Sequence, residues 1–168
     1  MKAGSNAYSP FMADSPRSPE PSPQPPQSCN FDAKKLDLKL SVTLSADRDA
    51  VDQVVRSIMN VVREVKCAPG SEDDIELALT EALANAVVHG AKSDPSKVIE
   101  CDVACDDERG LLIIVRDPGS GFDPSKLSDP RQGENIYADH GRGIYLINQL
   151  MDEVQFHKNG AEIHMLKK

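Results

Sequence analysis

Residues 80–90 read TEALANAVVHG. Glu81, Asn85 and His89 recur at every fourth position, so on a helix they drift by only about 40° per step and form one polar row. The row borders an apolar stripe, where a carboxylate and an amide would be partly desolvated. Such a place suits a proton acceptor and a cation ligand, although an ExxxN pattern alone is also common on solvated helix faces.

The stretch falls at the end of a predicted helix over residues 71–91. Its apolar stripe consists of Ile75, Ala78, Leu79, Ala82 and Ala86. Ser71 followed by Asp74 resembles a capping box in which Asp replaces the usual Glu. Before it, valines and Ile58 at helical spacing predict another helix, which begins at Ser45 or Asp47, runs to about residue 66 and is ended by Pro69 and Gly70.

Strand patterns surround these two helices. Residues 36–44 and 98–105 alternate between apolar and polar, residues 111–115 form an apolar run, and residues 154–156 and 163–166 flank an Asn-Gly turn. A polar loop over 117–140 precedes a helix over about 143–151. The order β, α, α, β, β, long loop, α, β, β predicts an α/β (α+β) two-layer sandwich, with a mostly antiparallel mixed sheet and helices on one face.

Composition predicts one domain and a tail. The chain has 168 residues, and residues 1–30 hold seven prolines and six serines, which predicts a disordered tail followed by a domain over 31–168. The tail carries two basic and two acidic groups, so the net charge of -8 belongs to the domain. Because phosphate backbones require clustered Lys and Arg, this acidic domain is not expected to bind nucleic acid.

The four cysteines form no CxxC pair and show no zinc spacing with the histidines, which predicts reduced thiols in the cytoplasm. Cys101 and Cys105 share one strand face and are expected in the core. His140, His157 and His164 have no carboxylates at metal-ligand spacing, so no protein-only metal site is expected. No apolar stretch approaches the roughly 18 residues of a membrane span, and no signal peptide is visible at the start, so no membrane contact is expected.

Two glycine-containing motifs complete the candidate site. DPGSGF, residues 117–122, follows an apolar strand, and its glycines would let the backbone turn sharply and approach a ligand that Asp117 faces. HGRGI, residues 140–144, places two glycines at a helix start, where free N–H groups attract phosphate and Arg142 can reach a terminal phosphate. Taken singly, a motif of the first kind is often only a surface loop, and one of the second kind is weak evidence for a phosphate site.

Taken together and in this order, TEALANAVVHG, RDPGSGFDP and HGRGIYLI resemble the N box and the first and second glycine boxes of the GHKL superfamily of ATPases, which includes gyrase and histidine kinases. Within that superfamily the chain looks most like the short RsbW-like anti-sigma serine kinases. The resemblance extends over residues 36–168.

The resemblance implies a role for each motif residue. Glu81 matches the general base, Asn85 the Mg²⁺ ligand, and Asp117 the carboxylate that binds the adenine amino group. The remaining matches are Gly119 and Gly121 under the adenine, Gly141 and Gly143 as phosphate-binding backbone, Arg142 near the γ-phosphate, and residues 124–140 as a lid. His89 is either a further nucleotide contact or a structural histidine. Ala161 stands where the superfamily often has an adenine-binding Thr.

The implied cofactors are ATP and Mg²⁺, and the implied activity is that of an ATP-dependent protein serine kinase that also acts as an anti-sigma factor. The resemblance implies three protein partners: a STAS-type anti-anti-sigma protein that receives the phosphate, a sigma factor, and a second copy of the chain. A different class of function stays open, namely an ATP-binding partner-switch module that transfers no phosphate or has a target other than a sigma factor. Glu81 favours the enzyme, because a binding module needs no base.

Overall fold

The computed structural model describes residues 38–121 and 142–168. Within these ranges five strands form one sheet in the order β1-β2-β3-β5-β4, and each neighbouring pair is antiparallel. The strands are β1 (Leu38–Ser45), β2 (Val98–Asp106), β3 (Gly110–Arg116), β4 (Glu153–His157) and β5 (Glu162–Lys167). The predicted tail, the predicted lid and Gly141 lie outside the described residues.

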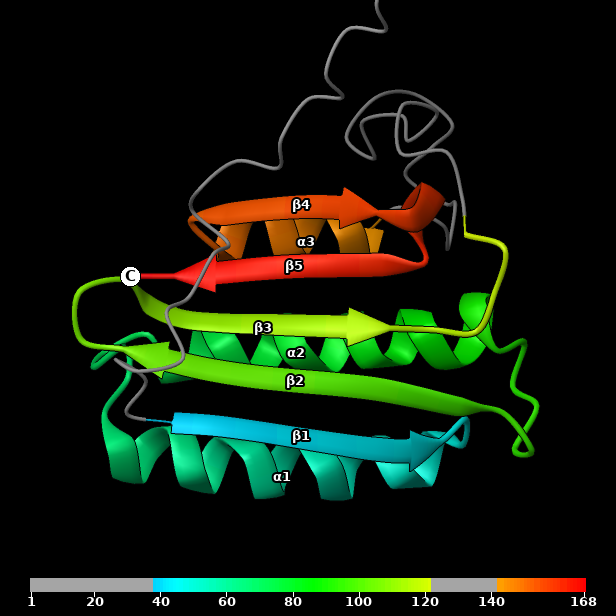
Figure 1. Ribbon diagram of the computed structural model, residues 1–168, viewed down its shortest axis with the longest axis horizontal. Coiled ribbons are helices and arrows are strands. Elements are labelled where there is room, and N and C mark those ends of the chain that lie inside the picture. The colour runs from blue at the N-terminus through cyan, green and yellow to red at the C-terminus, as the bar shows by residue number, and fades with distance from the viewer. Residues whose placement is uncertain (1–37, 122–141) are drawn as a thin grey trace, which may run out of the picture.

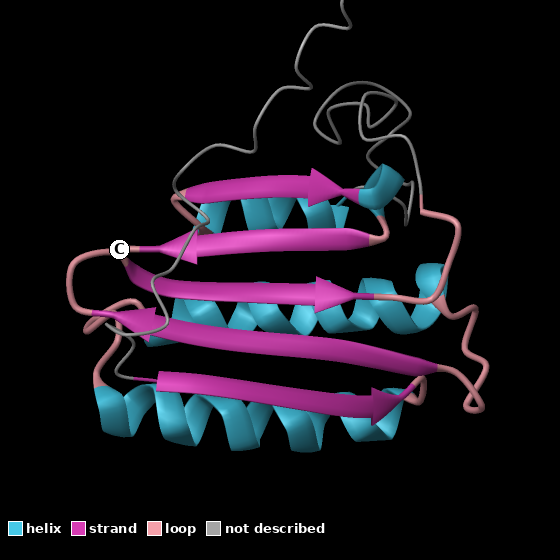
Figure 2. Ribbon diagram, in the orientation of Figure 1, coloured by secondary structure: helices cyan, strands magenta, loops and turns pink. Residues whose placement is uncertain are grey.

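The helices α1 (Arg48–Val65), α2 (Glu72–Asn85) and α3 (Arg142–Leu150) all lie behind the sheet in Figure 1. α1 covers β1, α2 covers the centre of the sheet, and α3 covers β4 and β5. Figure 2 shows the same two layers by type of element, with the front face of the sheet bare of helices within the described residues. This arrangement confirms the predicted two-layer α/β sandwich with helices on one face.

Helix α1 forms as its sequence predicts. Asp47 is the N-cap, and its Oδ1 accepts a hydrogen bond of 3.2 Å from the N–H of Asp49. The helix ends at Val65, and its C-cap Lys66 adopts a left-handed conformation with φ 58°. Its buried stripe consists of Val51, Val55, Ile58, Met59 and Val62.

Helix α2 departs from prediction at both ends. Ser71 is its N-cap residue but makes no side-chain capping bond, so the expected capping box is wrong. The reason is local: Ser71 has ψ 11° instead of the extended backbone that directs a capping hydroxyl at the helix. At the other end, the α-helix stops at Asn85 and continues as a π-helical turn, Ala86–Gly90, in which the N–H of Ala91 bonds to the carbonyl of Ala86.

The core lies between the sheet and the helices. Cys101 and Cys105 are buried in it, as expected, and burial raises the pKa of the free Cys101 thiol to about 12. Cys67 and Cys105, however, form a disulfide, which corrects the expectation of reduced thiols for this pair. They are 38 residues apart, a separation with no sequence signature, and the fold brings their Cα atoms to 5.7 Å. In the described ranges no helix is long and apolar enough to span a membrane.

Candidate functional site

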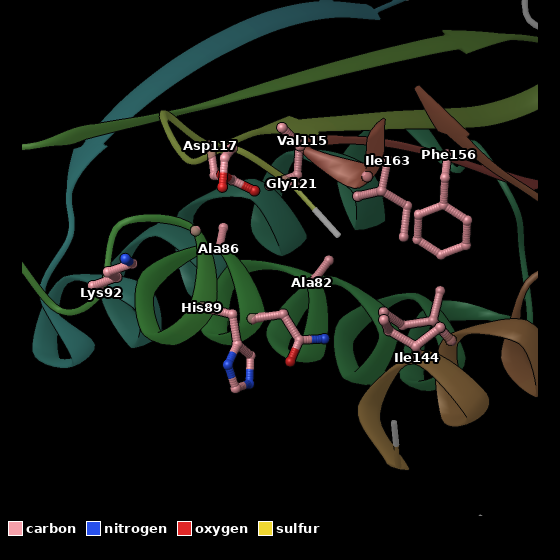
Figure 3. A pocket seen from close by; sticks show the side chains of 16 residues that line it. Ala82, Ala86, His89, Lys92, Val115, Asp117, Gly121, Ile144, Phe156 and Ile163 are labelled. Carbon is pink, nitrogen blue, oxygen red and sulfur yellow. The ribbon is translucent and has the colours of Figure 1, made fainter. Parts of the chain in front are cut away.

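A cavity of about 230 Å³ lies between the sheet and helices α2 and α3 (Figure 3). Its walls are mostly apolar: Val115, Phe156 and Ile163 come from the sheet, Ala82 and Ala86 from the segment of α2 and the π-turn, and Ile144 and Ile147 from α3. The polar side chains on its lining are Asn85, His89, Lys92, Asp117 and Ser120. A mostly apolar slot with a few polar groups is typical of a small-molecule site.

Asp117 directly follows β3 and is the single carboxylate among the described lining residues. Its N–H donates to the carbonyl of Ala161 at 3.0 Å, and its Oδ1 accepts from the N–H of Gly119 at 2.7 Å. Burial raises the pKa of Asp117, and the Gly119 hydrogen bond opposes that rise. A half-buried acceptor in an apolar slot suits an amino group on a flat ring.

Three glycines allow the backbone to pack closely around Asp117. A Cβ on Gly90 would lie 2.1 Å from Cγ of Asp117, and a Cβ on Gly119 would lie 2.6 Å from the carbonyl oxygen of Gly90. Gly121 has φ +74°, and a Cβ there would lie 2.0 Å from the carbonyl oxygen of Asn159. The π-turn, the loop after β3 and the β4–β5 turn therefore meet at these glycines.

The first and third motifs also meet. A Cβ on Gly143 would lie 2.6 Å from Oε2 of Glu81 and 3.2 Å from Nδ2 of Asn85. The first turn of α3 thus rests directly on the polar row of α2. Arg142, the first residue of α3, is exposed, and Gly141 lies outside the described residues.

The predicted site residues therefore divide into two groups. Asn85, His89, Asp117 and Gly121 line the cavity, with His89 exposed. The other described ones are not on its lining: Gly119 donates a hydrogen bond to Asp117, Gly143 lies against Glu81, and Arg142 is exposed at the start of α3. In the described ranges no cluster of three or more His, Cys, Asp or Glu could hold a metal ion.

Sequence reasoning missed several lining residues. Gly90 ends the first motif, and its position there was the available signal. Lys92 has a left-handed backbone with φ 59°, which no sequence pattern indicated. Ser120 lies inside the second motif. Phe156 falls in the predicted strand over 154–156, where alternation with the neighbouring residue puts it on the same face as Val154, the core side.

Comparison with known proteins agrees with this geometry. The family model described as "Histidine kinase-like ATPase domain" matches residues 44–167, and the chain belongs to this family. It is similar to the serine-protein kinase RsbW of Staphylococcus epidermidis, at 38% identity over 112 residues, which cover 60% of this chain and 69% of that protein. The RsbW kinase of Bacillus cereus is 28% identical over 136 residues, 77% of this chain and 84% of its own length. The resemblance to the GHKL superfamily and its RsbW-like members is confirmed.

Proposed function

We propose that this chain is an ATP-dependent protein serine kinase that also acts as an anti-sigma factor. The observation that carries the proposal is the contact of Glu81 and Asn85 with Gly143, beside an apolar cavity that holds Asp117. Figure 3 shows Asp117 and Ile144, the residue after Gly143, on opposite sides of this cavity. Membership of the histidine kinase-like ATPase family and the similarity to RsbW serine-protein kinases support the same activity.

In this proposal the adenine ring enters the apolar part of the cavity and donates its amino N–H to Asp117. Gly119 and Gly121 shape the turn that lies under the ring. The phosphates would extend toward the start of α3, where Gly143 offers a backbone N–H group and the helix dipole favours negative charge. The resemblance assigns the same role to Gly141, which lies outside the described residues. His89 and Arg142 are exposed and would contact the nucleotide and its γ-phosphate.

Asn85 would hold a Mg²⁺ ion together with phosphates and water, because its amide oxygen is a hard ligand and Mg²⁺ ions usually keep several water molecules. When bound, this ion would neutralise charge on the phosphates. Glu81 would take the proton from a serine hydroxyl while the serine oxygen forms a bond to the γ-phosphorus. The bond from that phosphorus to the β–γ bridging oxygen would break, and ADP would be released. Arg142 would offset the charge that spreads over the transferred group.

The serine would belong to a STAS-type anti-anti-sigma protein, and a sigma factor would be the competing partner. The chain would work as a homodimer in the cytoplasm, with its ATP-binding domain over residues 31–168 behind a separate tail. The alternative is a partner-switch module that binds ATP without transferring phosphate, or one with a target other than a sigma factor. The position of Glu81 beside Gly143 supports the enzyme.

The first prediction tests Glu81 as the base. Glu81→Gln should lower transfer of labelled γ-phosphate to a STAS-type protein that co-purifies with the chain by about 10²–10⁴-fold. Mg-ATP affinity, measured by calorimetric titration, should change little, since Asn85, Asp117 and the glycines are intact. Glu76→Gln is the matched control, because Glu76 also lies on α2 but pairs with Arg63 of α1.

Three results would contradict parts of the proposal. Equal phosphate transfer by wild type and Glu81→Gln would show that the base is assigned wrongly. A wild-type protein that binds ATP but phosphorylates no co-purifying partner would favour the binding module. An ATP affinity that Asp117→Asn leaves unchanged would place the nucleotide elsewhere.

A further inference from the structure

A cluster of charged side chains lies on the outer face of the sheet, directly behind the wall of the cavity. In the register of β3 and β5, Arg116 is paired with Glu162, and Val115 with Ile163. Val115 and Ile163 belong to the core on the helix side. Because side chains alternate along a strand, Arg116 and Glu162 point to the opposite face.

Glu162 is the centre of this cluster. Its Oε2 accepts hydrogen bonds from Nε of Arg116 at 2.9 Å and from Nζ of Lys158 at 2.7 Å, while its Oε1 lies 2.7 Å from Nε2 of His164. Its side chain is 10% exposed. Burial alone would raise its pKa, but the bonds from Lys158 and His164 and the charge of Arg116 lower the pKa of Glu162 to about 2, so it is ionised at neutral pH.

Arg116 extends the cluster to a third strand. It also pairs with Asp102 of β2 and lies 3.9 Å from Glu100 of the same strand. The cluster therefore ties β2, β3 and β5 together at the end of the sheet where β3 enters the candidate site. If a buried carboxylate loses one of these partners, its charge is left uncompensated, which lowers the stability of the fold.

The cluster is one residue away from the cavity on two strands. Asp117 follows Arg116, and Ala161 precedes Glu162. The N–H of Asp117 donates a hydrogen bond of 3.0 Å to the carbonyl of Ala161. The bond from Lys158 to Glu162 also spans the 3₁₀ turn Lys158–Gly160, in which Lys158 and Asn159 have left-handed φ of 50° and 56°. That turn carries Gly160, which lines the cavity, and the Asn159 carbonyl against which Gly121 packs.

We propose that Glu162 is a positioning residue for recognition of the nucleotide base. By holding Arg116 and Lys158, it fixes Asp117 and the turn at residues 158–161 at the spacing that the base requires. Glu162 itself lies on the outer face and does not enter the cavity. This inference rests on the proposed nucleotide site and adds a determinant of its selectivity.

The test compares ATP with inosine triphosphate, whose base has a carbonyl in place of the amino group that Asp117 would accept. Glu162→Gln keeps the size of the side chain but removes its charge. It should weaken ATP binding about tenfold while changing inosine triphosphate binding little, since a displaced Asp117 loses a contact that only ATP makes. Calorimetric titration gives both affinities, and thermal unfolding shows that the variant is folded.

Two further variants separate positioning from general loosening. Glu100→Gln is the matched control, because Glu100 lies in the same row across the sheet but its side chain is 60% exposed. It should leave both affinities unchanged. Lys158→Met removes one partner of Glu162 from a side chain that is 67% exposed, so it should fold normally and lose part of the preference for ATP.

The proposal would be overturned if both Glu162→Gln and Lys158→Met kept the wild-type preference for ATP over inosine triphosphate. It would also be overturned if the variants lost affinity for the two nucleotides equally, because Glu162 would then have a purely structural role. If Glu162→Gln does not fold, Lys158→Met decides alone. A wild-type protein that binds neither nucleotide would instead overturn the proposed function, and with it the premise of this inference. The failures of the two proposals are therefore distinguishable.

Discussion

At the scale of single residues, the candidate site requires a glycine at position 90. It faces Asp117 so closely that no side chain can stand between them, and its own backbone carbonyl lies against Gly119. Gly90 has no positive φ, so its lack of a side chain matters here for space and not for backbone conformation. The position of the Asp117 carboxylate therefore depends on the absence of a side chain at Gly90.

We predict that Gly90→Ala weakens ATP binding by more than about tenfold, because the new Cβ must displace the Asp117 carboxylate. Gly70→Ala is the opposite case: its φ of +87° makes a side chain strained, but nothing lies within 4 Å. It should cost about 1 kcal/mol of stability and leave ATP affinity unchanged. Calorimetric titration and urea unfolding of both variants check the contrast, which fails if Gly90→Ala binds ATP like wild type.

At the scale of elements, the connection between α1 and α2 leads into the helix that carries Glu81 and Asn85. Cys67 lies in this connection, and its disulfide to Cys105 ties it to the end of β2. The same helix ends in the π-turn that carries His89 and Gly90 to the cavity. The disulfide therefore lies before the start of α2, and the π-turn follows its end.

We predict that reducing the disulfide lowers the free energy of unfolding by about 2–4 kcal/mol, because the bond closes a long loop of the unfolded chain. Urea unfolding with and without dithiothreitol measures this loss. Cys67→Ala should show no response to the reductant. Thiol titration of the denatured, unreduced protein should find two of the four cysteines free; four free thiols would contradict the disulfide.

At the scale of the whole molecule, the family match over residues 44–167 takes in all helices and strands of the described ranges except the first part of β1. The Pro- and Ser-rich residues 1–30 lie outside that match. Few large apolar residues occur there, so we expect this segment to add little to the core.

We predict that deleting residues 1–30 changes the free energy of unfolding by less than about 0.5 kcal/mol and leaves ATP affinity intact. Deleting residues 1–45 is the control, because it also removes β1, which pairs with β2 along its whole length. That variant should lose its cooperative thermal transition. A large drop in the melting temperature of the shorter deletion would move the domain boundary toward the N-terminus.

The sequence alone determined the order and type of the elements and the three motifs. Apolar periodicity and glycine positions are local properties, so α1, the strands and the two-layer architecture followed from them without knowledge of contacts. The resemblance carried by the three ordered motifs implied that Asn85 and Asp117 share one site, and the structure puts both on the lining of one cavity.

The tertiary structure alone decided the contacts between distant residues. Cys67 meets Cys105, Gly90 faces Asp117, and Arg116 pairs with Glu162 across 46 residues of sequence. Each contact depends on strand register or on where a helix ends, and a shift of one residue would send the side chain to the other face of the sheet. The expected capping box was wrong because the backbone angle ψ of Ser71 cannot be read from residue spacing. The expectation of reduced thiols was wrong for Cys67 and Cys105 because the fold, and not the local sequence, sets the distance between them.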